Sequence, residues 1–66
     1  MNQTPIQIAR LSKKLSQEKT ARLLDISLRH YQKIEYGEVL PNIRTGLRLA
    51  LILEVNPYEL FNIEYS

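Results

Sequence analysis

Apolar positions along the chain recur every three or four residues in a series of short runs, without a convincing alternation of period two. Spacing of three or four residues is typical of amphipathic helices, whereas a half-buried strand requires alternation. The pattern therefore predicts an all-α fold. We expect five short helices: one from Thr4-Pro5, one from Ser16, one over Leu28 to about Tyr36, one over about Ile43 to Leu53, and a short one from Asn56-Pro57 through Leu60 and Phe61.

Residues that typically begin or end helices stand between these runs. A hydroxyl followed by proline at Thr4-Pro5 is typical of an N-cap and the first helical residue, and Ser16 can cap the second helix. Gly37 is expected to end the third helix. In the first helix, Ile6, Ala9, Arg10 and Lys13 follow at helical spacing, and Arg10 lies on the inward stripe. The other positions expected to face the core are Thr20, Ala21, Leu23 and Leu24; Tyr31 and Ile34; and Leu47, Leu49, Ala50 and Leu53.

Only Asp25, Ile26 and Ser27 separate the second and third helical runs. Asp tolerates the left-handed conformation that often ends a helix, and Ser27 can cap the next one. With so short a connection, the two helices must cross steeply. Such a pair is the helix-turn-helix arrangement, which sets its second helix into the major groove of DNA.

The composition is that of one small domain. The 66 residues include no cysteine, so no disulfide or thiolate metal site can form, and His30 is the single histidine. We expect one domain over residues 1–66, with its core at about 5–61 and a short tail at 62–66. Neither a cofactor nor a metal ion is expected.

Charge is divided unevenly along the chain. Residues 1–48 carry all nine Lys and Arg residues, whereas residues 49–66 carry three glutamates and no basic residue. This division favours a surface that faces a polyanion, although a merely solubilising surface has the same composition. The start of the chain does not resemble a signal peptide, and the longest apolar run, Leu49 to Leu53, is far too short to span a bilayer. The sequence thus favours a cytoplasmic protein that does not enter membranes.

A longer pattern is more specific. The segment LSQEKTARLLDIS…YQKIEYGEVLPN…LRLALILEVNPYELF, from Leu15 to Phe61, resembles the phage-repressor/Cro-like helix-turn-helix family, also called the XRE family. The resemblance implies a compact five-helix, lambda-repressor-like DNA-binding domain whose second and third helices form the helix-turn-helix. The matching elements are Leu15-Ser16-Gln17, Ala21, Leu24, Ile26-Ser27, Ile34-Glu35-x-Gly37, Pro41, Ala50, Leu53, Val55 and Leu60-Phe61.

Four residues depart from the pattern of this family. Asp25 and Glu54 stand at turns where the family commonly has glycine, and Thr20 stands where leucine is usual. Gly46 replaces a large apolar residue of the fourth helix, which predicts unfilled volume in the core. Tyr31 is larger than the usual aliphatic residue at its position, and we expect it to fill that volume.

The outward positions of the third helix are the candidates for reading DNA. If Tyr31 and Ile34 face the core, an exposed stripe of other residues faces the groove. Arg can form a bidentate contact with guanine, Gln with adenine, and Leu can lie against a thymine methyl group. The stripe, to which the resemblance also points, comprises Ser27 at its tip, Leu28, Arg29, Gln32 and Lys33.

Other expected roles concern phosphates and structure. By resemblance, Gln17 contacts a backbone phosphate and steadies the start of the third helix. Tyr36 can reach a phosphate or simply pack, and Arg44, in the loop leading into the fourth helix, is expected to hold a phosphate. An inward Arg10 needs a carboxylate, because an unpaired buried charge is costly. The resemblance pairs it with Glu35 in a structural ion pair.

These features favour a sequence-specific transcriptional regulator, a repressor, that binds double-stranded DNA. The family is usually dimeric, and we expect a homodimer on a two-fold-related operator, formed through the fifth helix and the acidic C-terminal region; Ile8 and Leu11 are an alternative apolar contact. A second reading is an antitoxin-type or other protein-interaction module, although the tail NIEYS is short for wrapping a toxin. An enzyme is disfavoured, since no nucleophile–base set or phosphate-binding glycine loop is evident. No small-molecule ligand is expected.

Overall fold

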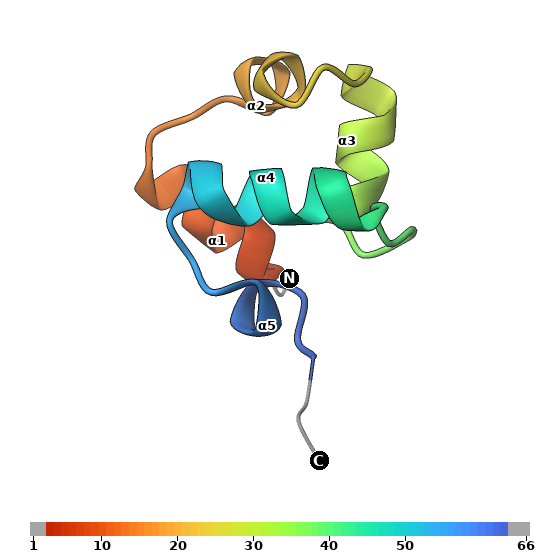
Figure 1. Ribbon diagram of the computed structural model, residues 1–66. Coiled ribbons are helices and arrows are strands. Elements are labelled where there is room, and N and C mark those ends of the chain that lie inside the picture. Colours follow the sequence, from red (N-terminus) through yellow and green to blue (C-terminus); the bar gives the residue numbers. More distant parts are fainter. Residues whose placement is uncertain (1–2, 64–66) are drawn as a thin grey trace.

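Five helices and no strand make up the part of the chain that the computed structural model describes, residues 3–63 (Figure 1). The all-α class and the five-helix order predicted from the sequence are confirmed. The expected tail lies partly beyond this range, since residues 64–66 fall outside the described residues. The helices are α1 (Pro5–Ser12), α2 (Gln17–Leu23), α3 (Leu28–Glu35), α4 (Ile43–Leu53) and α5 (Pro57–Leu60).

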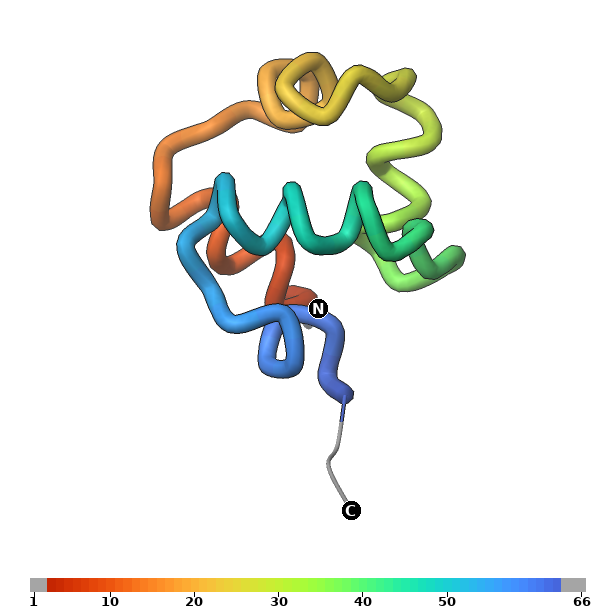
Figure 2. Tube along the Cα trace, viewed as in Figure 1, coloured from red at the N-terminus to blue at the C-terminus, as the bar shows by residue number. Residues whose placement is uncertain are grey.

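The helices surround a single packed centre. In Figure 1, α4 crosses the middle of the molecule with α1 behind it, while α2 lies above, α3 to one side and α5 below. The tube in Figure 2 shows that α2 enters α3 through one tight bend and that the two helices run at a steep angle to each other. The α5 helix packs against both α4 and α1, which brings the end of the described chain beside its beginning.

Each helix begins at a side chain that accepts a backbone N–H of its first turn. Such caps satisfy amide groups that a helix leaves without internal partners, which matters most when the helices are short. The helix starts expected at Thr4, Ser16 and Asn56 are confirmed. The capping bonds are Thr4 Oγ1 to Gln7 N at 3.2 Å, Ser16 Oγ to Lys19 N at 2.9 Å, Ser27 Oγ to His30 N at 3.0 Å, Asn42 Oδ1 to Thr45 N at 2.8 Å, and Asn56 Oδ1 to Tyr58 N at 2.8 Å.

Within residues 3–63, four turns between helices use the left-handed backbone conformation. The turn between α1 and α2 does so at Lys14, with a φ angle of 59°. Asp25 and Glu54, the two positions where a glycine is common in similar domains, have φ angles of 58° and 57°, and Gly37 has a φ angle of 79°. A side chain at such an angle is strained, although less for Asp than for most residues. The sharp turns are therefore made in spite of the residue type at Asp25 and Glu54.

Within residues 3–63, nine apolar residues form the core, and each is at most 5% exposed. They come from all five helices and from the α2–α3 connection. Three further buried residues are polar or charged: Arg10, Thr20 and Glu35. The apolar members are Ile6, Ala21, Leu24, Tyr31, Ile34, Leu49, Ala50, Leu53 and Leu60.

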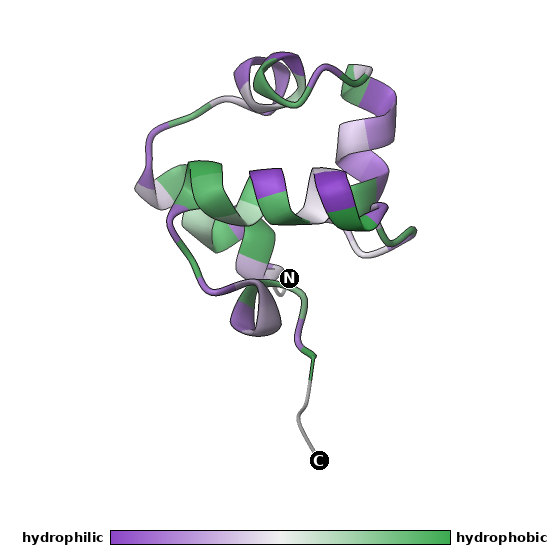
Figure 3. Ribbon diagram, in the orientation of Figure 1, coloured by the Kyte–Doolittle hydropathy of each residue, from purple (hydrophilic) through white to green (hydrophobic). Residues whose placement is uncertain are grey.

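Two residues expected in the core are instead exposed. Leu23 is 39% exposed and Leu47 is 53% exposed. Apolar residues occur all round α4, so spacing alone does not distinguish the buried stripe from its neighbour. In Figure 3, α4 is coloured mainly as apolar, whereas α3 is coloured mainly as hydrophilic. The buried stripe of α4 is Gly46, Leu49, Ala50 and Leu53.

The expected role of Tyr31 beside Gly46 is wrong. A Cβ atom built on Gly46 would lie 3.4 Å from Cγ of Pro41 and 3.5 Å from Cε2 of Phe61. The space beside the glycine is thus filled by a loop proline and by a ring at the end of α5. Tyr31 is completely buried elsewhere, in the hydrogen-bond network described below.

Membrane-spanning helices and metal-binding clusters were the two features examined over the described residues. None of the helices within residues 3–63 combines the length and apolarity needed to cross a bilayer. Over the same range, no three side chains of the metal-ligating types are grouped so that they could hold an ion.

Candidate nucleic-acid interface

The connection between α2 and α3 fixes the angle of α3 by its own hydrogen bonds. The Asp25 amide donates to the carbonyl of Arg22 at 3.0 Å, and the Ile26 amide donates to the carbonyl of Ala21 at 3.1 Å. This is the Schellman arrangement, in which a left-handed residue reverses the chain at a helix end. The Ile26 side chain then packs on the core, which anchors the turn between the two helices.

The α3 helix has a buried face and an exposed face. Tyr31, Ile34 and Glu35 are buried, whereas Leu28 and Arg29 are exposed and Gln32 and Lys33 are partly exposed. At 3.6 residues per turn, Arg29 and Lys33 lie on the side away from the core and Gln32 lies at its flank. Leu28 is exposed because it opens the helix, where no later turn covers it. The structure therefore brings together on one surface the residues expected to read DNA.

Ser27 lies at the tip of this surface as the N-cap of α3, with its side chain exposed. Its hydroxyl oxygen accepts the His30 amide, so the hydroxyl proton remains able to donate to a phosphate or a base. His30 itself is exposed. The first turn of α3 is thus both fixed by a cap and open to a ligand.

A buried ion pair ties α1 to the end of α3. Arg10 Nε lies 2.6 Å from Oε1 of Glu35, and Arg10 Nη2 donates to Oε2 at 3.4 Å. The two side chains are 8% and 0% exposed. Arg10 also donates to the carbonyl of Leu15 at 2.7 Å, and the hydroxyl of Thr4 donates to the backbone carbonyl of Glu35 at 2.6 Å. Helix α1 therefore braces α3 through two nitrogen atoms of Arg10 and through its N-cap, Thr4.

The Glu35 carboxylate is stabilised in its charged form. Burial acts to raise the pKa of Glu35, but hydrogen bonds from Arg10, Tyr31 and Gln17 outweigh it and hold that pKa below the usual glutamate value. Burial and the bond to Glu35 raise the pKa of Tyr31, whose hydroxyl donates to Oε1 at 2.7 Å. The hydrogen bond to Glu35 raises the pKa of Arg10. The network is thus an ionised carboxylate surrounded by donors.

Gln17, the first residue of α2, joins the same network. Its Nε2 atom donates to Oε2 of Glu35 at 2.7 Å and to the hydroxyl oxygen of Tyr36 at 2.8 Å. Its Oε1 atom accepts from Nε2 of Gln32 at 3.1 Å. The sequence-based expectation that Gln17 steadies the start of α3 is wrong, because its partners lie in the second half of α3 and at its C-cap.

The two remaining residues predicted to contact DNA, Tyr36 and Arg44, lie near the C-terminal end of α3. Tyr36 is the C-cap of α3; the residue is 49% exposed, and its hydroxyl accepts from Gln17. Arg44 is exposed and belongs to the first turn of α4, not to the preceding loop. Figure 1 shows this end of α4 beside the C-terminal end of α3. Both residues therefore border the exposed surface of α3.

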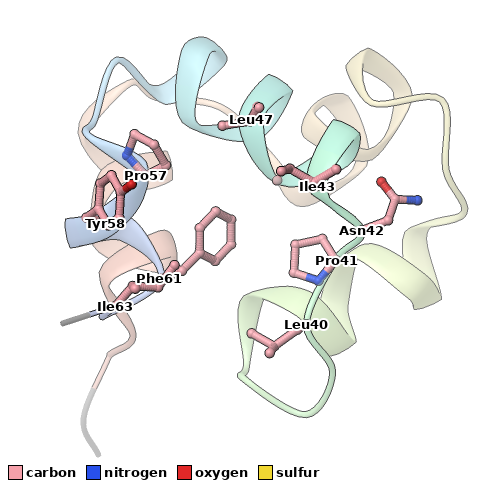
Figure 4. Close-up of a pocket in the computed structure, with 10 residues that line it drawn as sticks. Leu40, Pro41, Asn42, Ile43, Leu47, Pro57, Tyr58, Phe61 and Ile63 are labelled. Atoms are coloured by element: carbon pink, nitrogen blue, oxygen red, sulfur yellow. The ribbon is translucent and has the colours of Figure 1, made fainter. Parts of the chain in front are cut away.

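The expectations from the sequence missed an apolar groove between α4, α5 and the loop before α4, with a volume of about 290 Å³ (Figure 4). Leu40 and Ile43 at its edge are 82% and 81% exposed. The apolar residues Leu40 and Ile43 on either side of Pro41-Asn42 were the available signal. The lining residues are Leu40, Pro41, Asn42, Ile43, Gly46, Leu47, Pro57, Tyr58, Phe61 and Ile63.

Comparison with known proteins agrees with this geometry. A model of the helix-turn-helix family HTH_3 matches residues 6–60, which include all five helices except the first residue of α1. A search of curated proteins gives no match. The matched range contains the α2–α3 pair, the buried Arg10–Glu35 ion pair and the exposed stripe of α3. The chain belongs to the XRE-type helix-turn-helix family of DNA-binding transcriptional regulators.

Proposed function

We propose that the protein is a sequence-specific repressor that inserts α3 into the major groove of DNA and binds a two-fold-related operator as a homodimer in the cytoplasm. Leu28, Arg29, Gln32 and Lys33 face the base edges in this proposal. Ser27 contacts the DNA at the tip of α3. Tyr36 and Arg44 hold phosphates beyond its other end, so the protein contacts the backbone on both sides of the groove.

The observation that carries this proposal is the pairing of an exposed polar stripe with a rigid support. The outer side of α3 presents Arg29, Gln32 and Lys33, whose side chains carry the donors and acceptors needed for base edges. The inner side is held by α2 and by the buried Arg10–Glu35 pair. A stripe held in one orientation suits direct reading of a sequence.

Selection from a random duplex library tests the proposal. The expected result is an enriched palindrome whose half-sites are roughly 34 Å apart, one turn of the double helix. Affinity for random duplex should also fall with salt, with a logarithmic slope of about −0.9 for each phosphate neutralised. Enrichment of no motif, or binding that does not change with salt, would contradict DNA reading.

The apolar groove supports the proposed homodimer. Residues at its edge come from α5 and from the residues that follow it, the part of the chain expected to form the dimer; residues 64–66 lie outside the described range. The molecule measures 35 × 26 × 22 Å, so two copies in contact fit half-sites about 34 Å apart. The alternative contact at Ile8 and Leu11 is also exposed, at 54% and 47%, on α1.

The same groove supports a second candidate function, an antitoxin-type module in which DNA binding is secondary. Exposed apolar patches with polar surroundings often mark sites of protein interaction. Purification of the protein from its native cells distinguishes the two candidates. A stoichiometric second polypeptide that blocks dimer formation favours the module, whereas a dimer without a second polypeptide favours the repressor.

A further inference from the structure

The last turn of α2 leaves backbone carbonyls that no later residue of the same helix can bond. The turn toward α3 satisfies most of them, since amides of residues 24–26 donate to the carbonyls of residues 20–22 at 3.0–3.2 Å. Within residues 3–63, the carbonyl of Leu23 receives no backbone amide. Nη2 of Arg48, on α4, donates to it at 3.3 Å. The guanidinium thus supplies the bond that the turn does not.

The Arg48 bond gives a direction to the contact between α4 and α2. The C-terminal end of a helix carries partial negative charge, so a guanidinium is favoured there. Among residues 3–63, this is the one hydrogen bond that joins the two helices. They also meet in the apolar core, to which α2 contributes Ala21 and α4 contributes Leu49 and Leu53. Since apolar contacts depend little on direction, the Arg48 bond is the one that can fix where the end of α2 lies along α4.

The same face of α4 carries a second exposed arginine. Arg44 and Arg48 are four residues apart, so they are neighbours on the helix surface. In the proposed complex, Arg44 holds a phosphate, and phosphate contacts fix the register of a protein on the duplex. One helix therefore connects a phosphate contact with the turn from which α3 begins.

We propose that Arg48 is a positioning residue for base recognition, which holds the first turn of α3 in register with the phosphate that Arg44 contacts. This inference rests on the proposed reading of DNA by α3. The first turn should depend on the bond most, because Ser27, the N-cap of α3, follows Leu23 by only four residues. The far end of α3 should depend on it least, since the buried ion pair with α1 holds that end separately.

Selection from a random duplex library with four proteins tests this proposal: the wild type, Arg29→Ala, Arg48→Met and Arg22→Met. The Arg29→Ala variant identifies the base pair that the first turn of α3 reads. At that base pair, Arg48→Met should reduce the preference by about twofold to fivefold, as expected for loss of one exposed hydrogen bond from a charged group. The preferences elsewhere in the half-site should change less.

Arg22→Met is the matched control for the loss of charge. Arg22 is an exposed arginine in the last turn of α2, and its Nη2 lies 3.4 Å from Oε1 of Glu18. Its removal takes one positive charge from the same end of α2 and leaves the bond to Leu23. The variant should keep the wild-type preference. An equal change in Arg22→Met would attribute the effect to charge alone and overturn the inference.

The outcomes separate this inference from the proposed function. A wild-type motif that Arg48→Met leaves unchanged would overturn the inference and leave DNA reading intact. A preference lost equally at every base pair of the half-site would also overturn it, since that is the effect of general destabilisation. If Arg29→Ala changes no base preference, the first turn reads no base through Arg29 and the inference is wrong. If the wild type enriches no motif, the proposed function fails and the inference fails with it.

Hydrogen exchange tests the Arg48 bond without DNA. The amides of Asp25 and Ile26 close the turn beside the Leu23 carbonyl, so their exchange reports local opening of that turn. In Arg48→Met they should exchange about twofold to fivefold faster than in the wild type, as for the loss of one exposed bond. The amides of α1 and the Arg22→Met variant should keep wild-type rates. Unchanged exchange at the turn in Arg48→Met, or equal acceleration in α1, would overturn the positioning by Arg48.

Discussion

The two halves of the molecule are built by different interactions. In the first half, α1, α2 and α3 are joined by directional bonds that meet at the Glu35 carboxylate. In the second half, α4 and α5 meet through apolar side chains, among them Leu49, Leu53 and Leu60 in the core. The first half also exposes a polar stripe on α3, whereas the second exposes an apolar groove.

The two kinds of interaction suit the two halves to different tasks. Hydrogen bonds at a buried carboxylate allow few geometries, so α3 is held at one angle and can present donors and acceptors in fixed directions. Apolar contacts depend little on direction, so the groove beside α4 suits association of two surfaces. The proposed functions divide in the same way, with DNA read by the first half and the dimer formed by the second.

Removal of Arg10 should have the largest effect, because it breaks the interactions that hold the first half. Arg10→Met leaves the Glu35 carboxylate buried without its cation, and we expect the free energy of unfolding to fall by about 3–5 kcal/mol. Denaturation by urea measures this value. The loss is large for a domain in which total stability amounts to roughly 0.05–0.15 kcal/mol per residue.

A second ion pair supplies the control. Lys13 Nζ lies 2.6 Å from Oε2 of Glu54, the same distance as in the buried pair, but the Glu54 side chain is 72% exposed. Lys13→Met should leave stability nearly unchanged, since exposed pairs contribute little. Equal losses in the two variants would show that burial of the pair is not what makes the first half rigid.

Local signals in the sequence predicted much of the first half. Thr4 and Ser16 are caps whose partners lie three residues away, and the spacing of Tyr31 and Ile34 assigned the buried face of α3. The Gln17 network could not be predicted in the same way, because its partners lie 15 to 19 positions further along the chain. Such contacts depend on the angle between helices, which spacing does not give.

The second half was harder to predict for a different reason. Apolar residues surround α4, so the helical period does not choose between Leu47, which is exposed, and Leu49, which is buried. The neighbours of Gly46 likewise come from a loop and from α5. An apolar surface that binds a partner has the same sequence pattern as one that enters the core.

A charge in the groove should separate association from folding. Leu47 is 53% exposed and lines the groove. Leu47→Lys is expected to weaken the dimer about tenfold or more, as substitution of a residue that contributes strongly to an interface does. Its stability should change by no more than about 0.5 kcal/mol. Sedimentation equilibrium measures the dimer, and Ile8→Lys on α1 is the matched control. A weaker dimer only in Ile8→Lys would place the interface on α1.

Acid should destabilise the first half through Glu35. The pKa of Glu35 in the folded protein lies below its ordinary value of 4.5, so its contribution is complete above that pH and is lost as the pH falls toward the folded pKa. Urea denaturation of wild type and Glu35→Gln between pH 7 and pH 3 measures the effect. The advantage of the wild type should shrink below pH 4.5; an advantage that grows there would contradict the ionised network.

The smallest effect is expected at the turn that joins α2 to α3. Asp25 has a φ angle of 58°, which glycine adopts without strain. Asp25→Gly should raise the free energy of unfolding by about 0.5–1 kcal/mol, whereas Asp25→Ala should lower it. Thermal denaturation of the two variants provides the measurement. Changes of the same sign in both would mean that the left-handed turn does not limit stability.

Titration of the isotope-labelled protein with duplex DNA, followed by amide NMR signals, shows which surface of the protein binds DNA. The largest shifts are expected at Leu28, Arg29, Gln32 and Lys33 when the selected operator is added. The groove residue Leu47 should shift much less. Large shifts along α4 and the groove, with the signals of α3 unmoved, would show that another surface binds the DNA.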